Sequence, residues 1–276
     1  MIWKIQNRTH ELGRRGWIMG VLNVTPDSFS DGGQFVHVES ALEHARKMIF
    51  EGAEIIDVGG ESSRPGALPV SVEEEKRRVL PVIAALRNES DVLISIDTCK
   101  PEVARAAIAS GANIVNDISG LRTPEMLDLV ASSGVGAVAM HMNGTPLKMQ
   151  ESPHYDDVVQ EVRTFFEDRL TACVERKIDP SCIVFDPGIG FGKTVEHNLA
   201  LLRNLALIRP PNRPMLVGVS RKSFLSKITG DDTPEGRFWP TVALTSFCRE
   251  AGAEIIRVHD VLPNLHALRM TEAIHG

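Results

Sequence analysis

Short apolar, β-branched runs recur along the chain at a regular spacing. They occupy residues 17–23, 54–60, 92–98, 113–119, 135–141, 182–187, 214–220 and 254–260. A run that is apolar at nearly every position predicts a strand buried on both faces, as in a parallel sheet. The pattern therefore predicts eight buried strands.

Helical patterns lie between most of these runs. Ser71 and Glu74 have the spacing of a capping box, and Thr123 followed by Pro124 has the pattern of an N-cap and a first helical position. Residues 155–178 have the amphipathic pattern of one long helix. Strand and helix thus alternate along the chain.

The alternation sets the expected architecture. Gly-Ala pairs that begin at Gly52, Gly111 and Gly252 precede three of the strands, and glycine is the residue that most often ends a helix. Eight strand–helix units in about 250 residues predict a closed (β/α)8 barrel, a TIM barrel of class α/β. A doubly wound open sheet is the alternative.

The first residues depart from this repeat. Polar and apolar positions alternate around Trp3 and Ile5, which predicts a short N-terminal β-hairpin that turns near Gly13 and caps the bottom of the barrel. No linker rich in proline, glycine and serine divides the chain. We therefore expect a single domain over residues 1–276.

Composition and charge narrow the possible functions. The 30 basic and 36 acidic side chains give a net charge of −6 without basic runs, which argues against nucleic acid as the main partner. No apolar run reaches the roughly 18 residues of a membrane span, and the start lacks the apolar core of a signal peptide. Four cysteines without C-x-x-C spacing predict reduced thiols in a cytoplasmic protein.

Polar residues close the apolar runs, and a barrel of this type has its active site where the strands end. Arg257 and His259 are two apart on one strand, so both side chains face the same way and suit an anion. Helix N-caps are the plainer explanation for some of the aspartates. The other candidates are Asn23, Asp57, Asp97, Asn116, Asp117, His141, Asp186 and Ser220.

Two loops rich in Gly, Pro, Ser and Asp follow the first two predicted strands, at 23–33 and 59–67. Ordinary surface turns are one explanation. Because both loops lie on the catalytic rim and the second contains Arg64, we expect them to cover an anionic substrate.

The segment 185–194 ends in Gly-Lys-Thr, as a Walker A phosphate loop does. Pro187 stands at the first glycine position and has no N–H for a phosphate, and Asp186 would face the nucleotide's negative charge. We therefore expect no nucleotide site, and we interpret Asp186 as an acceptor at a strand end and Phe191 as part of an aromatic wall.

Lys222 directly follows the seventh predicted strand. It suits a Schiff-base lysine of a barrel aldolase, a surface lysine, or a donor to a ligand carbonyl. Ser223 stands near a helix start, where backbone N–H groups suit a carboxylate.

Eight segments carry a resemblance to a known family from about residue 18 to residue 262. They are MGVLNVTPDSFSDGG, DVGGESSRPGA, SIDT, NDISG, MHMNGTP, FDPGIGFGK, GVSRKSFL and RVHDV. In this order they resemble the dihydropteroate synthases of folate biosynthesis, whose fold is a (β/α)8 barrel. The resemblance implies an enzyme that joins p-aminobenzoate to 6-hydroxymethyl-7,8-dihydropterin diphosphate and releases pyrophosphate.

The resemblance also implies site roles. The pterin diphosphate site would be formed by Ser63, Asp97, Asn116, Asp186, Lys222, Arg257 and His259. Carboxylate and amide oxygens would accept from the pterin's N–H edge, and Lys222 would donate to its carbonyl. Asn23 would ligate Mg²⁺, which keeps phosphate and water as its other ligands. We expect a largely dissociative displacement in which carboxylates stabilise the pterin cation.

The p-aminobenzoate site implied by the resemblance consists of Phe29, Ser63, Arg64, Pro65, Phe191, Lys222 and Ser223. The residues implied in catalysis are Asp31, Arg64, Lys222, Arg257 and His259. The aniline nitrogen is a nucleophile near neutral pH, so no strong general base is required, and sulfonamides should compete here. A homodimer is expected from the resemblance alone.

Three positions depart from the family's usual pattern: Ser63 replaces Thr, Asn143 replaces Gln, and Trp239-Pro240 replaces Gly and Ser or Thr. We expect Pro240 to be the first position of the last helix. Three alternatives stay open: a methyltetrahydrofolate-type pterin methyltransferase, a phosphosugar aldolase or isomerase that uses Lys222 covalently, and a catalytically silent pterin-binding paralogue.

Overall fold

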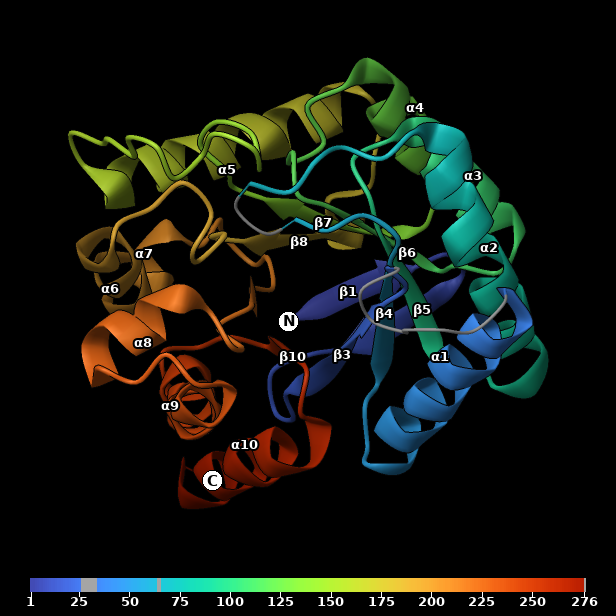
Figure 1. Ribbon diagram of the computed structural model, residues 1–276. Coiled ribbons are helices and arrows are strands. Elements are labelled where there is room, and N and C mark those ends of the chain that lie inside the picture. Colours follow the sequence, from blue (N-terminus) through green and yellow to red (C-terminus); the bar gives the residue numbers. More distant parts are fainter. Residues whose placement is uncertain (26–33, 64–65, 276) are drawn as a thin grey trace.

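The computed structural model describes residues 1–25, 34–63 and 66–275. Its main sheet has eight parallel strands in the order β8-β7-β6-β5-β4-β3-β10-β9. A parallel bridge between Phe185 and Met215 joins the two ends of this order, so the sheet closes into a barrel (Figure 1). The strands are β3 (Trp17–Asn23), β4 (Ile55–Gly59), β5 (Leu93–Asp97), β6 (Ile114–Asp117), β7 (Gly136–Met140), β8 (Ile183–Asp186), β9 (Leu216–Val217) and β10 (Ile255–Val258).

Helices surround this sheet, which confirms the (β/α)8 barrel and excludes the open sheet (Figure 1). They are α1 (Gln34–Phe50), α2 (Val72–Glu89), α3 (Pro101–Ala109), α4 (Pro124–Ser133), α5 (Val158–Glu175), the short 3₁₀ helix η2 (Pro180–Cys182), α6 (Val195–Arg203), α7 (Leu205–Ile208), α8 (Ser223–Thr229), α9 (Pro234–Glu250) and α10 (Val261–His275). None of these helices is long and apolar enough to cross a membrane. That the whole of 1–276 is one domain stays a prediction.

The predicted helix signals hold in part. Thr123 is the N-cap of α4, and Pro124 is its first residue. Ser71 accepts a hydrogen bond from the Glu74 backbone N–H at 3.2 Å. The Glu74 carboxylate instead binds Arg77 at 2.7 Å, so the reciprocal half of the capping box is absent.

The prediction for Pro240 is wrong. Thr233 and Pro234 form the N-cap and first position of α9, and Pro240 lies inside that helix. An internal proline costs the helix one backbone hydrogen bond, to the carbonyl four residues earlier. The earlier Thr-Pro pair has a stronger start signal because the Thr233 hydroxyl accepts from the Gly236 N–H at 3.0 Å.

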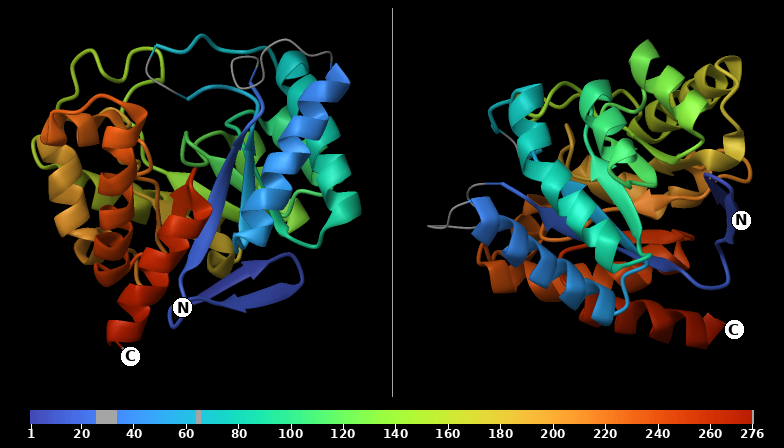
Figure 2. Two further views of the ribbon diagram at one scale, coloured as in Figure 1. Left: turned by 60° about the horizontal axis from the view of Figure 1, so that its bottom comes forward. Right: turned by 90° about the vertical axis from the view of Figure 1, so that its right-hand side faces the viewer.

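The N-terminal hairpin is present, with β1 (Ile2–Ile5) antiparallel to β2 (Arg8–Glu11). Its turn is at Gln6, whose φ is +53°, and not near Gly13 as expected. The Gln6 N–H binds the Gly134 carbonyl at 2.7 Å, which fixes the turn against the barrel. The hairpin lies across the lower end of the barrel in the left view of Figure 2, so the predicted cap is confirmed.

Alternate residues of each strand face the barrel interior, as in any closed sheet. Toward the hairpin end, every strand turns an apolar side chain inward. These side chains are Met19, Ile55, Leu93, Ile114, Val138, Val184, Leu216 and Ile255. These side chains pack against Trp3, Ile5 and Leu12 of the N-terminal segment. The outward residues pack against the helices in a separate cluster.

Two residues further along, the inward side chain is polar on five strands. These residues are Asp57, Ser95, Asn116, Asp186 and Arg257. We call them the polar layer. The interior of the barrel therefore changes from apolar at the hairpin end to charged at the end where the strands finish.

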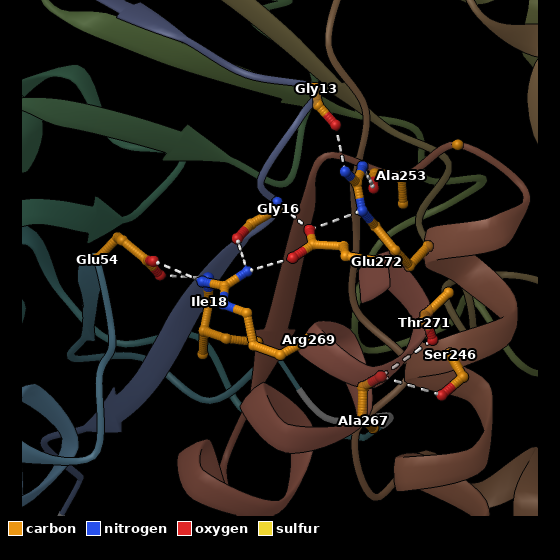
Figure 3. A network of polar contacts seen from close by, with 12 residues as sticks. Gly13, Gly16, Ile18, Glu54, Ser246, Ala253, Ala267, Arg269, Thr271 and Glu272 are labelled. Atoms are coloured by element: carbon orange, nitrogen blue, oxygen red, sulfur yellow. Dashed lines mark hydrogen bonds and ion pairs between the residues drawn. The ribbon is translucent and has the colours of Figure 1, made fainter. Parts of the chain in front are cut away.

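A network of arginines and carboxylates fastens the lower end (Figure 3). Arg269 binds Glu272 at 2.8 Å and Glu54 at 3.2 Å. Glu54 accepts the Ile18 backbone N–H at 2.7 Å, and Arg249 binds Glu272 at 3.0 Å. The network ties α9 and α10 to the start of β3.

Candidate active site

The polar layer is organised around Arg257 of β10. Its Nε donates to Asp57 Oδ2 at 2.7 Å, and its Nη2 donates to Asp97 Oδ2 at 2.7 Å. Asp57 Oδ2 also accepts from Asn116 Nδ2 at 3.0 Å. Three consecutive strands, β4, β5 and β6, and β10 on the far side of β3 thus each provide one member of a connected group.

Burial sets the protonation of this group. It raises the pKa of Asp97 to about 7, while Arg257 lowers that pKa and Asp57 raises it further. Burial works to lower the pKa of Arg257, but Asp57 and Asp97 raise it above its ordinary value. Arg257 therefore stays charged, whereas the raised pKa makes Asp97 easier to protonate than an exposed aspartate.

Asp186 and Lys222 form the other side of the barrel mouth. Burial raises the pKa of Asp186 to about 6, opposed by a hydrogen bond from the Gly188 N–H and by Lys222. Burial lowers the pKa of Lys222 to about 8, and Arg257 lowers it further. The Lys222 ammonium lies 4.0 Å from the centre of the Phe191 ring, within the range of a cation–π contact.

A cleft of about 250 Å³ opens above the polar layer. Its lining residues are Val21, Asn23, Thr25, Ser62, Ser63, Gly218, Ser220, Arg221, Lys222, Arg257 and His259. The structure therefore brings together six residues that the sequence predicted from different strands and loops. They are Asn23, Ser63, Ser220, Lys222, Arg257 and His259.

Arg257 and His259 share this cleft, as their spacing predicted. Ser220 Oγ lies 2.9 Å from His259 Nδ1 and accepts the His259 backbone N–H at 3.2 Å. Arg257 is held by two carboxylates, which the sequence did not predict. An anion in this cleft would share the guanidinium with Asp57 and Asp97.

The remaining predicted residues fall into three groups. Phe191 is buried in a small apolar cluster with Met140, Met142 and Met149. Ser223 is exposed at the first position of α8. Phe29, Asp31, Arg64 and Pro65 lie outside the described residues.

The glycine-rich segment after β8 has a structural role. Gly188 has φ +62°, and a Cβ there would lie 1.9 Å from the His141 carbonyl oxygen, so only glycine fits. Lys193 is buried and donates to the Phe191 carbonyl at 3.0 Å. Its ammonium therefore faces the protein interior, which agrees with the expectation that this is no Walker A loop.

The sequence left the role of Asp57 undecided. It was one of several candidate acceptors, and in the structure it joins Arg257 to Asn116 at the centre of the polar layer.

The sequence analysis missed a contact between Lys193 and His141. Lys193 Nζ lies 3.0 Å from His141 Nδ1. Burial lowers the pKa of Lys193 to about 7 and that of His141 to about 2. A two-residue period laid over each apolar run would have found Asp57, whereas nothing local links Lys193 to His141.

Asn143, which departs from the family's usual glutamine, has an exposed side chain. Its amide donates to the His154 carbonyl at 3.4 Å. The side chain therefore does not form part of the barrel floor.

Only a sparse metal site is possible among the described residues. They contain no group of three or more His, Cys, Asp or Glu side chains that could hold a metal. Asn23, at the end of β3, turns an amide toward the cleft that holds Arg257 and His259. One amide oxygen fits a Mg²⁺ whose other ligands are diphosphate and water.

Comparison with known proteins agrees with this geometry. The model of a family described as "Pterin binding enzyme" matches residues 19–259. The dihydropteroate synthase of Escherichia coli (strain K12) is 47% identical over 256 residues, which cover 93% of this chain and 90% of that protein.

Two solved structures have the same fold. A Yersinia pestis dihydropteroate synthase in complex with a sulfonamide drug has a TM-score of 0.92 at 42% identity, covering 100% of this chain and 99% of that one. A Xanthomonas albilineans dihydropteroate synthase with 4-aminobenzoic acid has a TM-score of 0.89 at 45% identity, covering 95% of this chain and 94% of that one. The polar layer, the cleft above it and these matches together show that the chain belongs to the pterin-binding enzymes, in the dihydropteroate synthase family.

Proposed function

We propose that this chain is a transferase that condenses 6-hydroxymethyl-7,8-dihydropterin diphosphate with p-aminobenzoate to give 7,8-dihydropteroate and pyrophosphate. One observation carries the proposal: acceptors for a pterin edge and cations for a diphosphate converge at one barrel mouth. Asp97, Asn116 and Asp186 are the acceptors, and Arg257 and Lys222 are the cations.

The pterin half is recognised by groups that are costly to leave unpaired. Its ring N–H and amino groups donate to Asp97, Asn116 and Asp186, and Lys222 donates to its carbonyl. A buried polar group without a partner costs about 1–3 kcal/mol. The same set therefore rejects rings that lack the matching edge.

The diphosphate half binds in the cleft above the polar layer. Arg257, His259 and Ser63 line this cleft, and Asn23 would hold Mg²⁺ there. When bound, the Mg²⁺ neutralises negative charge that develops on the leaving group. The diphosphate also competes with Asp57 and Asp97 for Arg257, which couples diphosphate binding to the charge of Asp97.

The bond change is a substitution at the pterin methylene. The C–O bond to the diphosphate breaks and its electron pair leaves with pyrophosphate. The aniline nitrogen then donates its lone pair to the methylene carbon and loses a proton to solvent. Carboxylates of the polar layer stabilise the positive charge on the pterin before the C–N bond forms, so the displacement is largely dissociative. Asp31 is a further candidate in this step.

The p-aminobenzoate site lies beside the same cleft. Phe191 and Lys222 lie together in a cation–π contact, and the aromatic ring of the second substrate would lie along them. Ser63 and Ser223 would contact its polar groups, with Phe29, Arg64 and Pro65 completing the pocket. Sulfonamides, as mimics of p-aminobenzoate, would compete at this position.

We also propose a homodimer in the cytoplasm. Helices α9 and α10 pack against each other and expose apolar side chains of Trp239, Phe247 and Met270, which supports a self-association face. All four cysteines are free, as expected in a reducing compartment. Sedimentation of the purified chain tests the dimer.

The decisive assay is pyrophosphate release from dihydropterin diphosphate and Mg²⁺. Release that requires p-aminobenzoate and falls with a sulfonamide supports the synthase. Tight pterin binding without turnover would instead favour a pterin methyltransferase or a silent paralogue. The methyltransferase has no need of the Arg257–His259 pair, which is why the synthase is the better proposal.

A further inference from the structure

Lys100 is a half-buried residue beside the active site, and it has none of the roles given above. It is the N-cap residue of α3, three residues after Asp97, which ends β5. Its Nζ binds Glu75 of α2 at 2.5 Å and the Val70 carbonyl at 2.8 Å, and it also binds the Glu61 carboxylate. One ammonium thus joins two helices to the segment that follows β4.

Glu61 extends this connection to the wall of the site. Its carboxylate accepts a hydrogen bond from the Val70 backbone N–H at 3.0 Å. Because Lys100 donates to the Val70 carbonyl, the two side chains together bind both backbone polar groups of Val70. Glu61 directly precedes Ser62 and Ser63. These two serines line the main cleft and also a second small hollow that contains Asp97.

Lys100 provides the positive charge that pairs with the Glu61 and Glu75 carboxylates. The Glu75 side chain is only 1% exposed, and the Glu61 and Lys100 side chains are 23% and 20% exposed. Among the described ion pairs, Lys100 is the partner of both carboxylates. Removal of the ammonium leaves a buried charge at Glu75, which is strongly unfavourable.

We propose that Lys100 is a positioning residue for p-aminobenzoate binding: by holding Glu61, it fixes Ser62 and Ser63 as the wall between the main cleft and the hollow beside Asp97. The inference rests on the proposed function for its kinetic part. The structural part, that Lys100 and Glu61 hold the backbone of Val70, does not depend on any activity.

The test compares Lys100→Met with Lys100→Arg. We expect Lys100→Met to raise the KM for p-aminobenzoate by about tenfold while kcat changes by less than about threefold. Lys100→Arg keeps the charge and should recover most of the affinity. Lys47→Met is the matched control, because Lys47 is an exposed lysine of α1 that pairs only weakly with Glu51, at 3.7 Å.

Two further measurements separate positioning from general destabilisation. If Lys100 acts through Ser63, Lys100→Met should change the KM by less than about twofold in a Ser63→Ala background. Hydrogen exchange at the Val70 amide should accelerate in Lys100→Met and not in Lys47→Met. Should Lys100→Met fail to fold, the double variant Glu75→Gln/Lys100→Met removes the buried charge and allows the same comparison.

The outcomes are distinct. An unchanged KM for p-aminobenzoate, or unchanged exchange at Val70, would overturn the proposal. A KM effect of the same size in the Ser63→Ala background would also overturn it, because the effect would then not act through Ser63. If the unmodified chain shows no turnover at all, the proposed function fails, while the exchange measurement still decides whether Lys100 fixes the segment.

Discussion

Arginine–carboxylate groups occur at both ends of this barrel, with opposite consequences. At the lower end, Arg249 and Arg269 bind Glu54 and Glu272, and backbone N–H and carbonyl groups complete the network (Figure 3). At the upper end, Arg257 binds Asp57 and Asp97 beneath an open cleft. The lower network fastens secondary structure, whereas the upper group is placed to meet a ligand.

The surroundings explain the difference. The hairpin fills the lower end with Trp3, Ile5 and Leu12, so no ligand can reach the barrel interior there. At the upper end the pKa of Asp97 is raised to about 7 and that of Lys222 is lowered to about 8. Displaced pKa values in a cleft are typical of functional sites. We therefore expect the same ion-pair chemistry to be structural where it is enclosed and functional where it is open.

The largest effect is expected from removing the central cation. Arg257→Met deletes the proposed diphosphate contact and leaves Asp57 and Asp97 without their partner. We expect kcat/KM to fall by about 10³-fold. The matched change at the lower end, Arg269→Met, should lower the unfolding free energy by about 1–3 kcal/mol and keep kcat/KM within about threefold. Steady-state kinetics and urea unfolding of both variants measure kcat/KM and the unfolding free energy. An equal loss of kcat/KM in the two variants would contradict the distinction between the two ends of the barrel.

A smaller effect is expected at the pterin edge. Asp186→Asn keeps the shape but loses the charged acceptor, so the KM for the pterin diphosphate should rise by about 10²-fold. Asp179→Asn, an exposed aspartate near the hairpin that binds Lys4 at 3.1 Å, is the control and should leave the KM unchanged. A similar KM for wild type and Asp186→Asn would show that Asp186 does not accept from the pterin.

The pH dependence of pterin binding should follow the upper carboxylates. The raised pKa values of Asp97, about 7, and Asp186, about 6, mean that protons bind as the pH falls through this range. Ionised acceptors are needed, so the affinity should be constant only above about pH 8, one unit above the pKa of Asp97, and fall by about tenfold per pH unit once a single required carboxylate is mostly protonated. Titration calorimetry with a pterin analogue from about pH 5 to about pH 9 tests this. An affinity that increases on acidification would contradict the assignment.

The smallest effect is expected at Lys193. Lys193→Met removes the donor to the Phe191 carbonyl and alters the support of the ring that lies under Lys222. We expect the KM for p-aminobenzoate to rise by about threefold, with a smaller change for the pterin substrate. Kinetics with each substrate varied in turn provide the measurement. A larger increase in the KM for the pterin substrate would show that Lys193 supports the pterin site and not the p-aminobenzoate site.

Much of this fold follows from the sequence because its signals are local. Apolar runs predicted the eight strands, and Gly52, Gly111 and Gly252 do adopt positive φ where helices end before strands. The hairpin turn and the start of α9 were misplaced. In both cases a tertiary contact or a competing cap decided the position: Gln6 binds Gly134, and Thr233 caps Gly236.

The sequence predicted the site residues that lie at strand ends, but it did not predict the contacts among them. Arg257 and His259 are two apart, so their shared cleft follows from the pleat of a strand. That Arg257 would be held by Asp57 and Asp97 depends on which strands are neighbours and on their stagger. The links from Lys193 to His141 and from Lys100 to Glu61 and Glu75 join separate loops and helices, and the sequence contains no local sign of them.

The most direct test of the central claim is a crystal structure with dihydropterin diphosphate and Mg²⁺ bound. We predict that the pterin edge lies against Asp97, Asn116 and Asp186, and that the diphosphate contacts Arg257 and His259. A ligand bound elsewhere, or a diphosphate that leaves Arg257 untouched, would contradict the division of the barrel into a structural lower end and a catalytic upper end.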